Sequence, residues 1–159
     1  MKILITGVAG FIGFSLARKL LISKYELVGI DNINDYYDQQ LKRSRLNILK
    51  NSGLCFHKID ISDTLRIHNF LNKEKFDIVI HLAAQAGVRY SINNPQAYLN
   101  SNINGFLNIL EGVRNSKVLH LMYASSSSVY GFNQKAPFLE KHNTDEPVSF
   151  YAASKKSNE

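Results

Sequence analysis

The fold is decided by residues 2–13, which read Lys2-Ile3-Leu4-Ile5-Thr6-Gly7-Val8-Ala9-Gly10-Phe11-Ile12-Gly13. The stretch opens with a short apolar run that is typical of a buried β-strand, and glycine then recurs at every third position. Residues 11–23 continue at helical spacing, with an apolar side made of Phe11, Leu16, Leu20 and Leu21. A strand, a glycine turn and a helix in this order predict the first unit of a parallel α/β sheet.

The alternation of strand and helix continues along the whole chain. Further apolar strands are expected at residues 26–30, 54–59, 76–82 and 117–124. Helices are expected at 39–50 and 64–73, from Pro95 to about residue 115, and from about Ser149 onward. Repeated β-α-β spacing with apolar strands indicates a parallel sheet that is covered on both faces. We therefore predict a Rossmann-like doubly wound sheet with strand order 3-2-1-4-5, in one domain over residues 1–159.

The glycine turn has the residues that a dinucleotide site needs. Gly7 permits a tight turn, Gly10 lets the backbone approach a pyrophosphate, and Gly13 lets the helix pack closely on the strand. Asp31 ends the second strand, near the position where an acid accepts hydrogen bonds from the adenosine ribose. Asn32 follows it, and no arginine stands beside it to hold a 2′-phosphate, so NAD is expected rather than NADP. A glycine-rich turn without a ligand is the alternative, and the order of strand, loop, helix and acid argues against it.

Other strand ends extend the expected cofactor site, because ligands of open α/β sheets lie outside the carboxyl ends of the strands. The pair Asp60-Ile61 follows the third strand and could meet the adenine. The pair Ala83-Ala84 offers small side chains after the fourth strand, where the cofactor would pass close to the backbone. Phe11 and Ile12, inside the glycine loop, are assigned to the same site. His81 is interpreted as a structural residue at the strand end rather than as a catalyst.

Tyr151 and Lys155 are the second informative pair. Their i, i+4 spacing on a helix places a phenol and an ammonium on one face, one turn apart. A nearby ammonium favours the phenolate, which makes the tyrosine a usable proton acceptor. The spacing alone is weak, since a chain with 8 tyrosines and many lysines can hold it by chance. Together with the glycine turn, it predicts a nicotinamide-dependent redox site at the C-terminal edge of the sheet.

Composition excludes other classes of function. The net charge of +6 comes from lysines and arginines spread along the chain, which favours a solvated surface, or a rim for an anionic substrate, over a nucleic-acid site. The single cysteine, Cys55, excludes an internal disulfide, and the five histidines show no metal-ligand spacing with it, so no metal is expected. Thr6, Gly7 and Gly10 interrupt the first apolar run and Arg18 follows soon after, so we expect no signal peptide, no membrane segment and a cytoplasmic protein.

With these residues in view, the chain resembles the extended short-chain dehydrogenases/reductases, in the group of nucleotide-sugar epimerases and dehydratases. The resemblance covers the whole chain and follows the order Gly7-x-x-Gly10-x-x-Gly13, Asp31-Asn32, His81-Leu82-Ala83-Ala84, Ser125-Ser126-Ser127-Ser128-Val129-Tyr130-Gly131 and Tyr151-x-x-x-Lys155. More narrowly, residues 31–38, 81–91 and 123–131 are similar to those of UDP-glucuronate 4-epimerases. The resemblance implies an NAD cofactor, a UDP-sugar substrate (UDP-glucuronate) and a homodimer.

The resemblance also implies roles for single residues. Tyr151 is the general base for the sugar 4-hydroxyl, and Lys155 hydrogen-bonds the nicotinamide ribose. Ser126 shares the reacting oxygen with Tyr151, and Ser127 and Ser128 line the same substrate edge. Asn102 aligns with a family asparagine near the cofactor. Dehydratases of the group place an Asp-Glu pair where this chain has Ser127 and Ser128, because water elimination needs a further acid and base. Epimerisation is therefore expected rather than dehydration.

The C-terminal end departs from the resemblance. Members of the group are longer, and their further part carries most of the nucleotide-sugar domain, whereas this chain ends at Glu159 within the catalytic helix. A truncated gene product, a piece made by design and a proteolytic remnant all remain open. We expect an epimerase module that is inactive alone. The alternatives are a cofactor-binding fragment without turnover, and a dehydratase or reductase of the same group.

Overall fold

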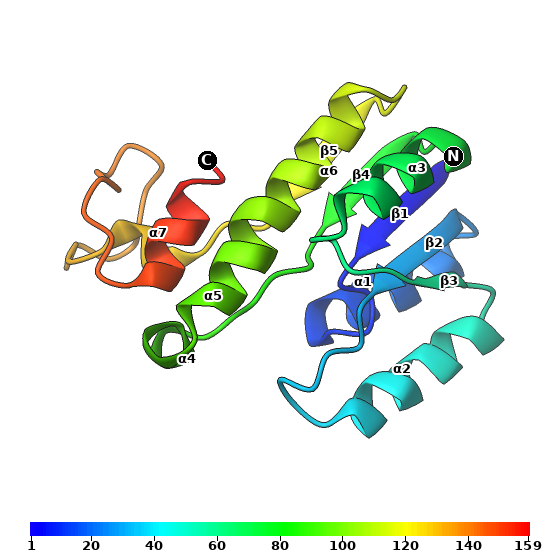
Figure 1. Ribbon diagram of the computed structural model, residues 1–159, viewed down its shortest axis with the longest axis horizontal. Helices are drawn as coiled ribbons and strands as arrows, with labels where there is room; N and C mark the ends of the chain where they lie inside the picture. Colours follow the sequence, from blue (N-terminus) through cyan, green and yellow to red (C-terminus); the bar gives the residue numbers. More distant parts are fainter.

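The computed structural model describes residues 1–159 and contains one sheet of five strands (Figure 1). All neighbouring strands are parallel and their order is β3-β2-β1-β4-β5, which confirms the predicted doubly wound topology. The strands are β1 (Lys2–Thr6), β2 (Glu26–Asp31), β3 (Cys55–Lys58), β4 (Ile78–His81) and β5 (His120–Tyr123).

Helices cover both faces of this sheet (Figure 1). One core cluster joins β1 and β2 to α1 and α2, and a second joins β1, β2 and β4 to α3 and α6. The helical elements are α1 (Phe11–Ile22), α2 (Gln39–Asn51), α3 (Thr64–Glu74), α4 (Val88–Asn93), α5 (Pro95–Tyr98), η1 (Leu99–Asn104), α6 (Gly105–Arg114), η2 (Ser127–Tyr130) and α7 (Phe150–Lys156).

The central strand β1 shows why the sheet must be covered on both sides. Ile3 and Ile5 belong to the first core cluster and Leu4 belongs to the second, because successive side chains of a strand point to opposite faces. All three are at most 4% exposed. A strand without a polar face is stable only between two layers of helices, and this burial places the carboxyl end of β1 in the middle of the molecule.

Three local details go beyond the expectations or differ from them. The helix expected from Pro95 to about residue 115 is confirmed, since α5, η1 and α6 follow one another without a gap to Arg114, but η1 within it is π-helical. The short helix α4 was not expected, because six residues are too few to show a helical period. Phe11 does not join the buried side of α1: it is 73% exposed, while Gly13 and Ala17 are the buried residues of that helix. Gly13 thus lets α1 lie closely against the turn after β1.

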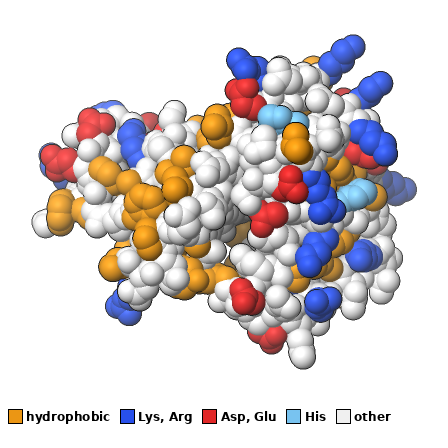
Figure 2. All heavy atoms as spheres, viewed as in Figure 1, with side chains coloured by type: hydrophobic (Ala, Val, Ile, Leu, Met, Phe, Trp, Pro, Cys, Tyr) orange, Lys and Arg blue, Asp and Glu red, His pale blue; other side chains and the backbone are white.

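The surface is divided by composition. In the view of Figure 2, hydrophobic side chains gather over the part that carries α4, α5 and α7, whereas lysines and arginines gather on the opposite side. Exposed apolar side chains of this part include Ile92, Leu99 and Phe150. No helix has both the length and the apolar character that crossing a membrane requires.

The glycines of the first turn differ in how tightly they are packed. A Cβ atom at Gly13 would meet the carbonyl oxygen of Gly7 and lie 2.9 Å from the Cα of Val8, whereas one at Gly10 would meet only the Gly7 oxygen, at 3.1 Å. We expect Gly13→Ala to lower the free energy of unfolding by about 1–3 kcal/mol, because backbone must move to make room. Gly10→Ala should cost less than about 1 kcal/mol. Urea unfolding of both variants checks this, and equal losses would contradict it.

Candidate functional site

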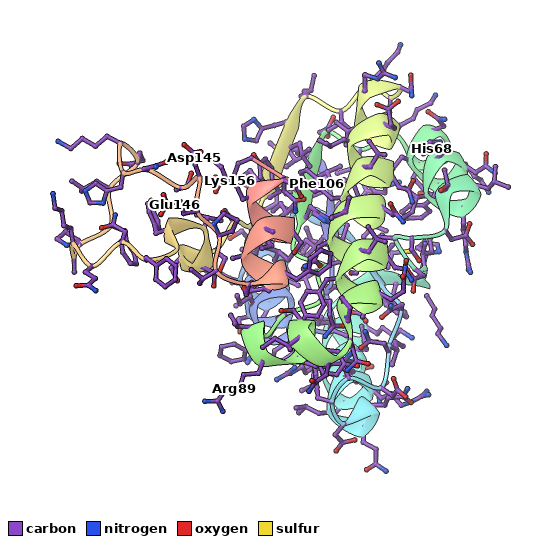
Figure 3. The ribbon with its side chains drawn as sticks, turned by 60° about the vertical axis from the view of Figure 1, so that its left-hand side comes forward. His68, Arg89, Phe106, Asp145, Glu146 and Lys156 are labelled. Carbon is purple, nitrogen blue, oxygen red and sulfur yellow. The ribbon has the colours of Figure 1, made fainter.

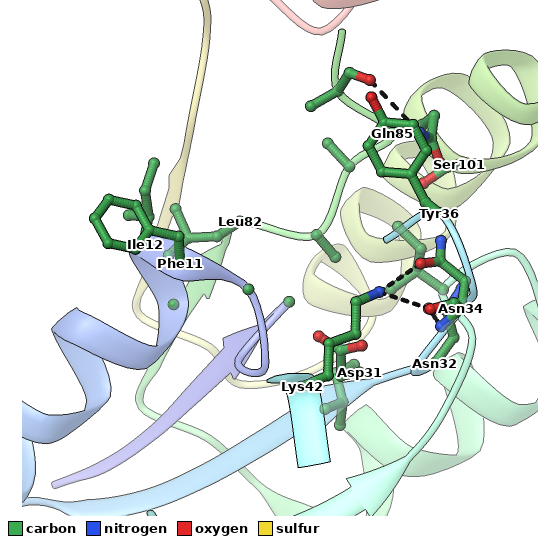
Figure 4. Close-up of a pocket in the computed structure, with 18 of the residues that line it drawn as sticks. Phe11, Ile12, Asp31, Asn32, Asn34, Tyr36, Lys42, Leu82, Gln85 and Ser101 are labelled. Atoms are coloured by element: carbon green, nitrogen blue, oxygen red, sulfur yellow. Dashed lines mark hydrogen bonds between the residues drawn. The ribbon is translucent and has the colours of Figure 1, made fainter. Parts of the chain in front are cut away.

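A cavity of about 500 Å³ lies at the carboxyl ends of β1, β2 and β4 (Figure 4). Its walls are the glycine loop, the end of β2, the start of α2 and the loop after β4. Many of the residues expected at the cofactor line it, namely Gly7, Gly10, Phe11, Ile12, Gly13, Asp31, Asn32, Ile61, Ala83 and Ala84. Four others do not: Asp60, Asn102, Tyr151 and Lys155. Figure 4 shows Phe11 and Ile12 on the glycine-loop side, apart from the group of Asp31, Lys42 and Asn34.

The glycine loop is held by backbone contacts on two sides. Gly7 has φ +70°, and its N–H donates to the carbonyl oxygen of Ile30 at 2.8 Å. A Cβ atom at Gly7 would lie 2.8 Å from both the backbone nitrogen and the Cα of Ala83. No other residue can take this conformation without strain, since positive φ and the lack of space both exclude a side chain. The loop therefore presents bare backbone to the cavity at the N-terminus of α1.

Asp31 fixes the loops on either side of it. Asp31 is only 8% exposed, yet it lines the cavity. Its Oδ2 accepts the N–H of Ala9 at 3.1 Å, and its Oδ1 accepts the N–H of Ile33 at 2.8 Å. Each carboxylate oxygen has a further acceptor position, so Asp31 can hold the backbone and still accept hydroxyl groups from a ligand.

Two cations at the same end of the cavity were missed by the sequence analysis. Lys42 and Arg45 on α2 both line it. The Lys42 ammonium donates to the backbone oxygen of Asn34 at 3.0 Å and to the Asn34 side chain (Figure 4). Burial lowers the pKa of Lys42, while the carboxylates of Asp31 and Asp35 oppose the shift. The i, i+3 spacing of the two cations on an expected helix was a signal, because it places them on one face.

Arg45 is hydrogen-bonded to other residues of the protein. Its guanidinium donates to the carbonyl oxygen of Ala9 at 3.3 Å and to the hydroxyl of Tyr37 at 3.3 Å. Arg45 thus lines the cavity although it is not adjacent to Asp31 in the sequence, because α2 carries it there. The remaining lining residues, which the sequence analysis did not assign to the cofactor site, are Ile30, Asn34, Tyr36, Tyr37, Leu41, Ile59, Leu82, Gln85, Ala86, Ser101 and Ala124.

Asp60 stands behind the cavity wall and supports Asn32. The Asn32 amide donates to Asp60 Oδ2 at 2.9 Å, and the N–H and hydroxyl of Ser62 donate to Asp60 Oδ1 at 2.9 and 2.7 Å. Burial would raise the pKa of Asp60, but these hydrogen bonds favour the carboxylate and lower the pKa overall. A role for Asp60 in contacting adenine stays a prediction.

Asn102 ties two walls of the site together. Its Oδ1 accepts the N–H of Gln85 at 2.7 Å, and its Nδ2 donates to the carbonyl oxygen of Gln85 and to Ser154 Oγ, both at 3.0 Å. Asn102 lies in the π-helical segment η1 and is 2% exposed. Such segments often occur at functional sites. Asn102 therefore connects the loop after β4 to α7, next to Lys155.

The helix α7 carries Tyr151 and Lys155. Ser149 caps this helix, since its Oγ accepts the N–H of Ala152 at 3.0 Å. Lys155 is 4% exposed, and its ammonium makes no hydrogen bond to the protein. Burial lowers the pKa of Lys155, and the carboxylate of Glu159 opposes this shift. The ammonium nitrogen itself is not fully enclosed, because the one fully buried side-chain nitrogen or oxygen without a partner is His68 Nε2. The ammonium is therefore free to donate to an acceptor on a ligand.

The serine run lies against this helix. Ser126 is the N-cap of the 3₁₀ turn η2, and its Oγ accepts the N–H of Ser128 at 3.2 Å. The turn η2 packs against α7. Ser126 and Ser128 are partly buried, and Ser127 is exposed. Ser125 donates a hydrogen bond to the Glu159 carboxylate. The structure thus gathers the serines and α7 beyond the end of β5, where Ala124 lines the cavity.

His81 has a structural position at the end of β4, as expected. The hydroxyl of Thr6 accepts the N–H groups of Leu82 and Ala83 at 3.1 and 3.0 Å, so its own proton points to His81 Nδ1, at 2.8 Å. The ring of Phe106, labelled in Figure 3, lies 5.5 Å from the imidazole. Burial lowers the pKa of His81 to about 3, and the Lys155 charge adds to this shift.

The buried imidazole predicts a loss of stability in acid. His81 stays neutral in the folded chain but takes up a proton on unfolding below pH 6.5, the ordinary pKa, so the folded state loses stability as the pH falls from 6.5 toward 3. At about pH 5 the loss is about 2 kcal/mol relative to neutral pH. Urea unfolding at both pH values should show this loss in the native chain and in His57→Gln, and a smaller loss in His81→Gln. An equal loss in the three proteins would contradict it.

Comparison with known proteins shows the family. A family model described as GDP-mannose 4,6 dehydratase matches residues 4–159. The chain belongs to this family of extended short-chain dehydrogenases/reductases. The Rossmann-like fold and the order of motifs seen in the sequence are thereby explained, and the chain corresponds to the N-terminal part of the family fold.

Single relatives place the chain more closely. It is 50% identical over 159 residues to protein CapI of Staphylococcus aureus, covering 100% of this chain and 48% of that protein. It is 46% identical over 160 residues to UDP-glucuronate 4-epimerase 2 of Arabidopsis thaliana, covering 100% of this chain and 37% of the relative. The crystal structure of UDP-glucuronic acid 4-epimerase from Bacillus cereus, in complex with UDP-glucuronic acid and NAD, superposes with a TM-score of 0.90 at 37% identity, over 99% of this chain and 50% of that chain.

These coverages define what the chain represents. It spans about half the length, or less, of the curated relatives that it matches.

Proposed function

We propose that the chain is the cofactor-binding part of an NAD-dependent nucleotide-sugar 4-epimerase that interconverts UDP-glucuronate and UDP-galacturonate. The observation that carries the proposal is the arrangement at one sheet edge: a cavity with a glycine floor and the buried carboxylate of Asp31, and α7 nearby with the unpaired ammonium of Lys155. The similarity to UDP-glucuronate 4-epimerases over the whole chain supports this choice of reaction, and the resemblance extends the proposal to a homodimer of the whole protein.

The residues present fit NAD. The bare backbone at Gly7, Gly10 and the N-terminus of α1 suits a pyrophosphate, because orphan N–H groups and the helix dipole favour an anion there. Asp31 has acceptor positions to spare for ribose hydroxyls. Lys155 lacks an acceptor, which the second ribose would supply. When bound, NAD accepts a hydride from the sugar C4 and later returns it to the opposite face.

Proton transfer is the part of the reaction that falls to this chain. We assign Tyr151 as the base that takes the proton of the 4-hydroxyl and gives it back on hydride return. Ser126 donates a hydrogen bond to the same sugar oxygen and keeps it in position, while Ser127 and Ser128 bind the sugar. The ammonium of Lys155 stabilises the negative charge that develops nearby, and its burial strengthens this effect.

Dehydration is the second candidate, because the family model is described as a GDP-mannose 4,6 dehydratase. Water elimination needs an acid and a base beyond the tyrosine. The turn η2 has serines at positions 127 and 128, where the resemblance places carboxylates in dehydratases. Ser127→Asp and Ser128→Glu would restore that pair. The serine pair therefore favours epimerisation.

The choice of cofactor gives the first test. We expect the chain to bind NAD more tightly than NADP, since a 2′-phosphate would meet the Asp31 carboxylate. Asp31→Ala should weaken NAD binding by about tenfold or more, because a ribose hydroxyl loses a charged acceptor. Asp35→Ala removes the same charge from an exposed neighbour and should leave the affinity within about twofold. Calorimetric titration of both variants, with their melting temperatures as a control for folding, measures this. Tighter binding of NADP than of NAD would contradict the assignment.

The reaction itself is tested on the full-length protein. Incubated with UDP-glucuronate, it should form UDP-galacturonate, which chromatography of the two uronates resolves. Tyr151→Phe should lower kcat by about a hundredfold or more, because the base is lost. Tyr130→Phe is the matched control. The ring of Tyr130 stacks on that of Phe138, with the centroids 4.4 Å apart, and the phenylalanine keeps this ring, so the variant should keep its activity. A product lighter by one water, or net release of NADH, would replace epimerisation by dehydration or oxidation.

The 159-residue chain alone should show little or no turnover, because it lacks the part that would hold the sugar against Tyr151. Turnover comparable to that of the full-length protein would contradict this expectation. The same assay therefore separates a cofactor-binding module from a complete catalyst.

A further inference from the structure

Tyr98 is a large side chain that is completely buried, at the junction of α5 and the π-helical segment η1. Its hydroxyl donates to the carbonyl oxygen of Ala86 at 2.8 Å and also contacts that of Gly87. Both carbonyls belong to the loop after β4, and Ala86 lines the cavity. Tyr98 is therefore anchored at its tip to the wall of the proposed cofactor site.

The ring of Tyr98 meets the ring of Tyr151. The two centroids are 5.9 Å apart at an interplanar angle of 70°, which is the edge-to-face geometry that aromatic pairs prefer. Tyr90 packs near Tyr98 with centroids 6.2 Å apart, and Tyr36 lies 4.9 Å beyond Tyr90. Tyr98 thus lies between the proposed catalytic base and the aromatic side chains that reach the cavity at Tyr36.

The buried hydroxyl of Tyr98 is suited to donating a hydrogen bond and not to accepting a proton. Burial raises the pKa of Tyr98 to about 12, and the neighbouring Tyr36, Tyr151 and Tyr90 oppose a further negative charge, while a hydrogen bond with Gln85 acts in the other direction. Tyr98 stays protonated at neutral pH and acts only as a hydrogen-bond donor toward the loop. It is therefore not a proton acceptor at neutral pH.

We propose that Tyr98 is a positioning residue, which holds the ring of Tyr151 in register with the cavity by joining it to the loop after β4. The functional part of this inference rests on the proposed function of Tyr151 as the base. Asn102 supports the same helix one turn further on, through Ser154. The phenol of Tyr151 is partly exposed, so it needs a rigid contact on its buried side to keep one orientation.

Ring motion in the 159-residue chain tests the contact without any turnover. Tyrosine rings are labelled with carbon-13, and the signals of Tyr151 are assigned by their loss in Tyr151→Phe. Tyr98→Met fills much of the space but has no rigid edge, so the flip rate of the Tyr151 ring should rise about tenfold or more. Tyr98→Phe keeps the edge and loses the anchor, so the rate should rise only about threefold.

Phe76→Met is the matched control, because Phe76 is also a buried aromatic (2% exposed) but belongs to the core cluster of α3 and α6. It should leave the flip rate of Tyr151 unchanged. An unchanged rate in a folded Tyr98→Met chain would overturn the proposal. If that variant does not fold, Tyr98→Phe decides alone, and an unchanged rate there has the same consequence.

Kinetics of the full-length protein then test the consequence for catalysis. Tyr98→Met should lower kcat about tenfold or more and leave the KM for UDP-glucuronate and the Kd for NAD within about twofold, since only the placement of the base is lost. A weaker affinity for NAD with unchanged kcat would overturn the positioning role. If the native full-length protein does not convert UDP-glucuronate, the proposed function fails, and the ring-flip experiment still decides whether Tyr98 fixes Tyr151.

Discussion

The close approach of two backbones at Gly7 is the constraint on which the site depends. The absence of a side chain there lets the turn after β1 lie directly against Ala83, after β4. The Gly7 N–H reaches β2 at the same time, through Ile30. One residue thus sets the spacing of three strand ends, and the cavity is the space that remains between them. Because this geometry is made of backbone, it is rigid before any ligand arrives, which reduces the cost of ordering on binding.

Buried polar side chains complete what the backbone begins. Asp31 holds the glycine loop through Ala9, and Thr6 links the ends of β1 and β4 through His81. Asn102 does the same for α7. Each of these side chains has hydrogen-bond partners within the protein, so burial stabilises one arrangement instead of penalising it. Lys155 differs from them, because its side chain is almost fully buried and its ammonium has no acceptor within the protein. The supporting side chains are thus paired within the protein, while the Lys155 ammonium remains available to a ligand.

Much of the fold could be predicted because its causes are local. The buried strands are apolar runs, the first turn has its glycines in the required order, and the strand order follows from right-handed crossovers. The π-helical segment within the helix after Pro95 could not be predicted, since it has no local signature, and its residue Asn102 makes contacts with residues far along the chain. The positions of Lys42 and Arg45 in the cavity depend on how α2 docks. The role proposed for Tyr98 could not be predicted from the sequence, because it depends on a ring contact with Tyr151, which is far along the chain.

The central claim is that a dinucleotide binds across the glycine loop, and amide shifts on adding NAD test it most directly. In the nitrogen-15-labelled 159-residue chain, NAD should move the signals of the glycine loop (residues 7–13), of Asp31 and Asn32, and of residues 83–86. The amides of α3, on the far side of the second core cluster, should stay in place. Shifts that gather instead around residues 130–146, or no shifts at saturating NAD, would show that this cavity is not the cofactor site.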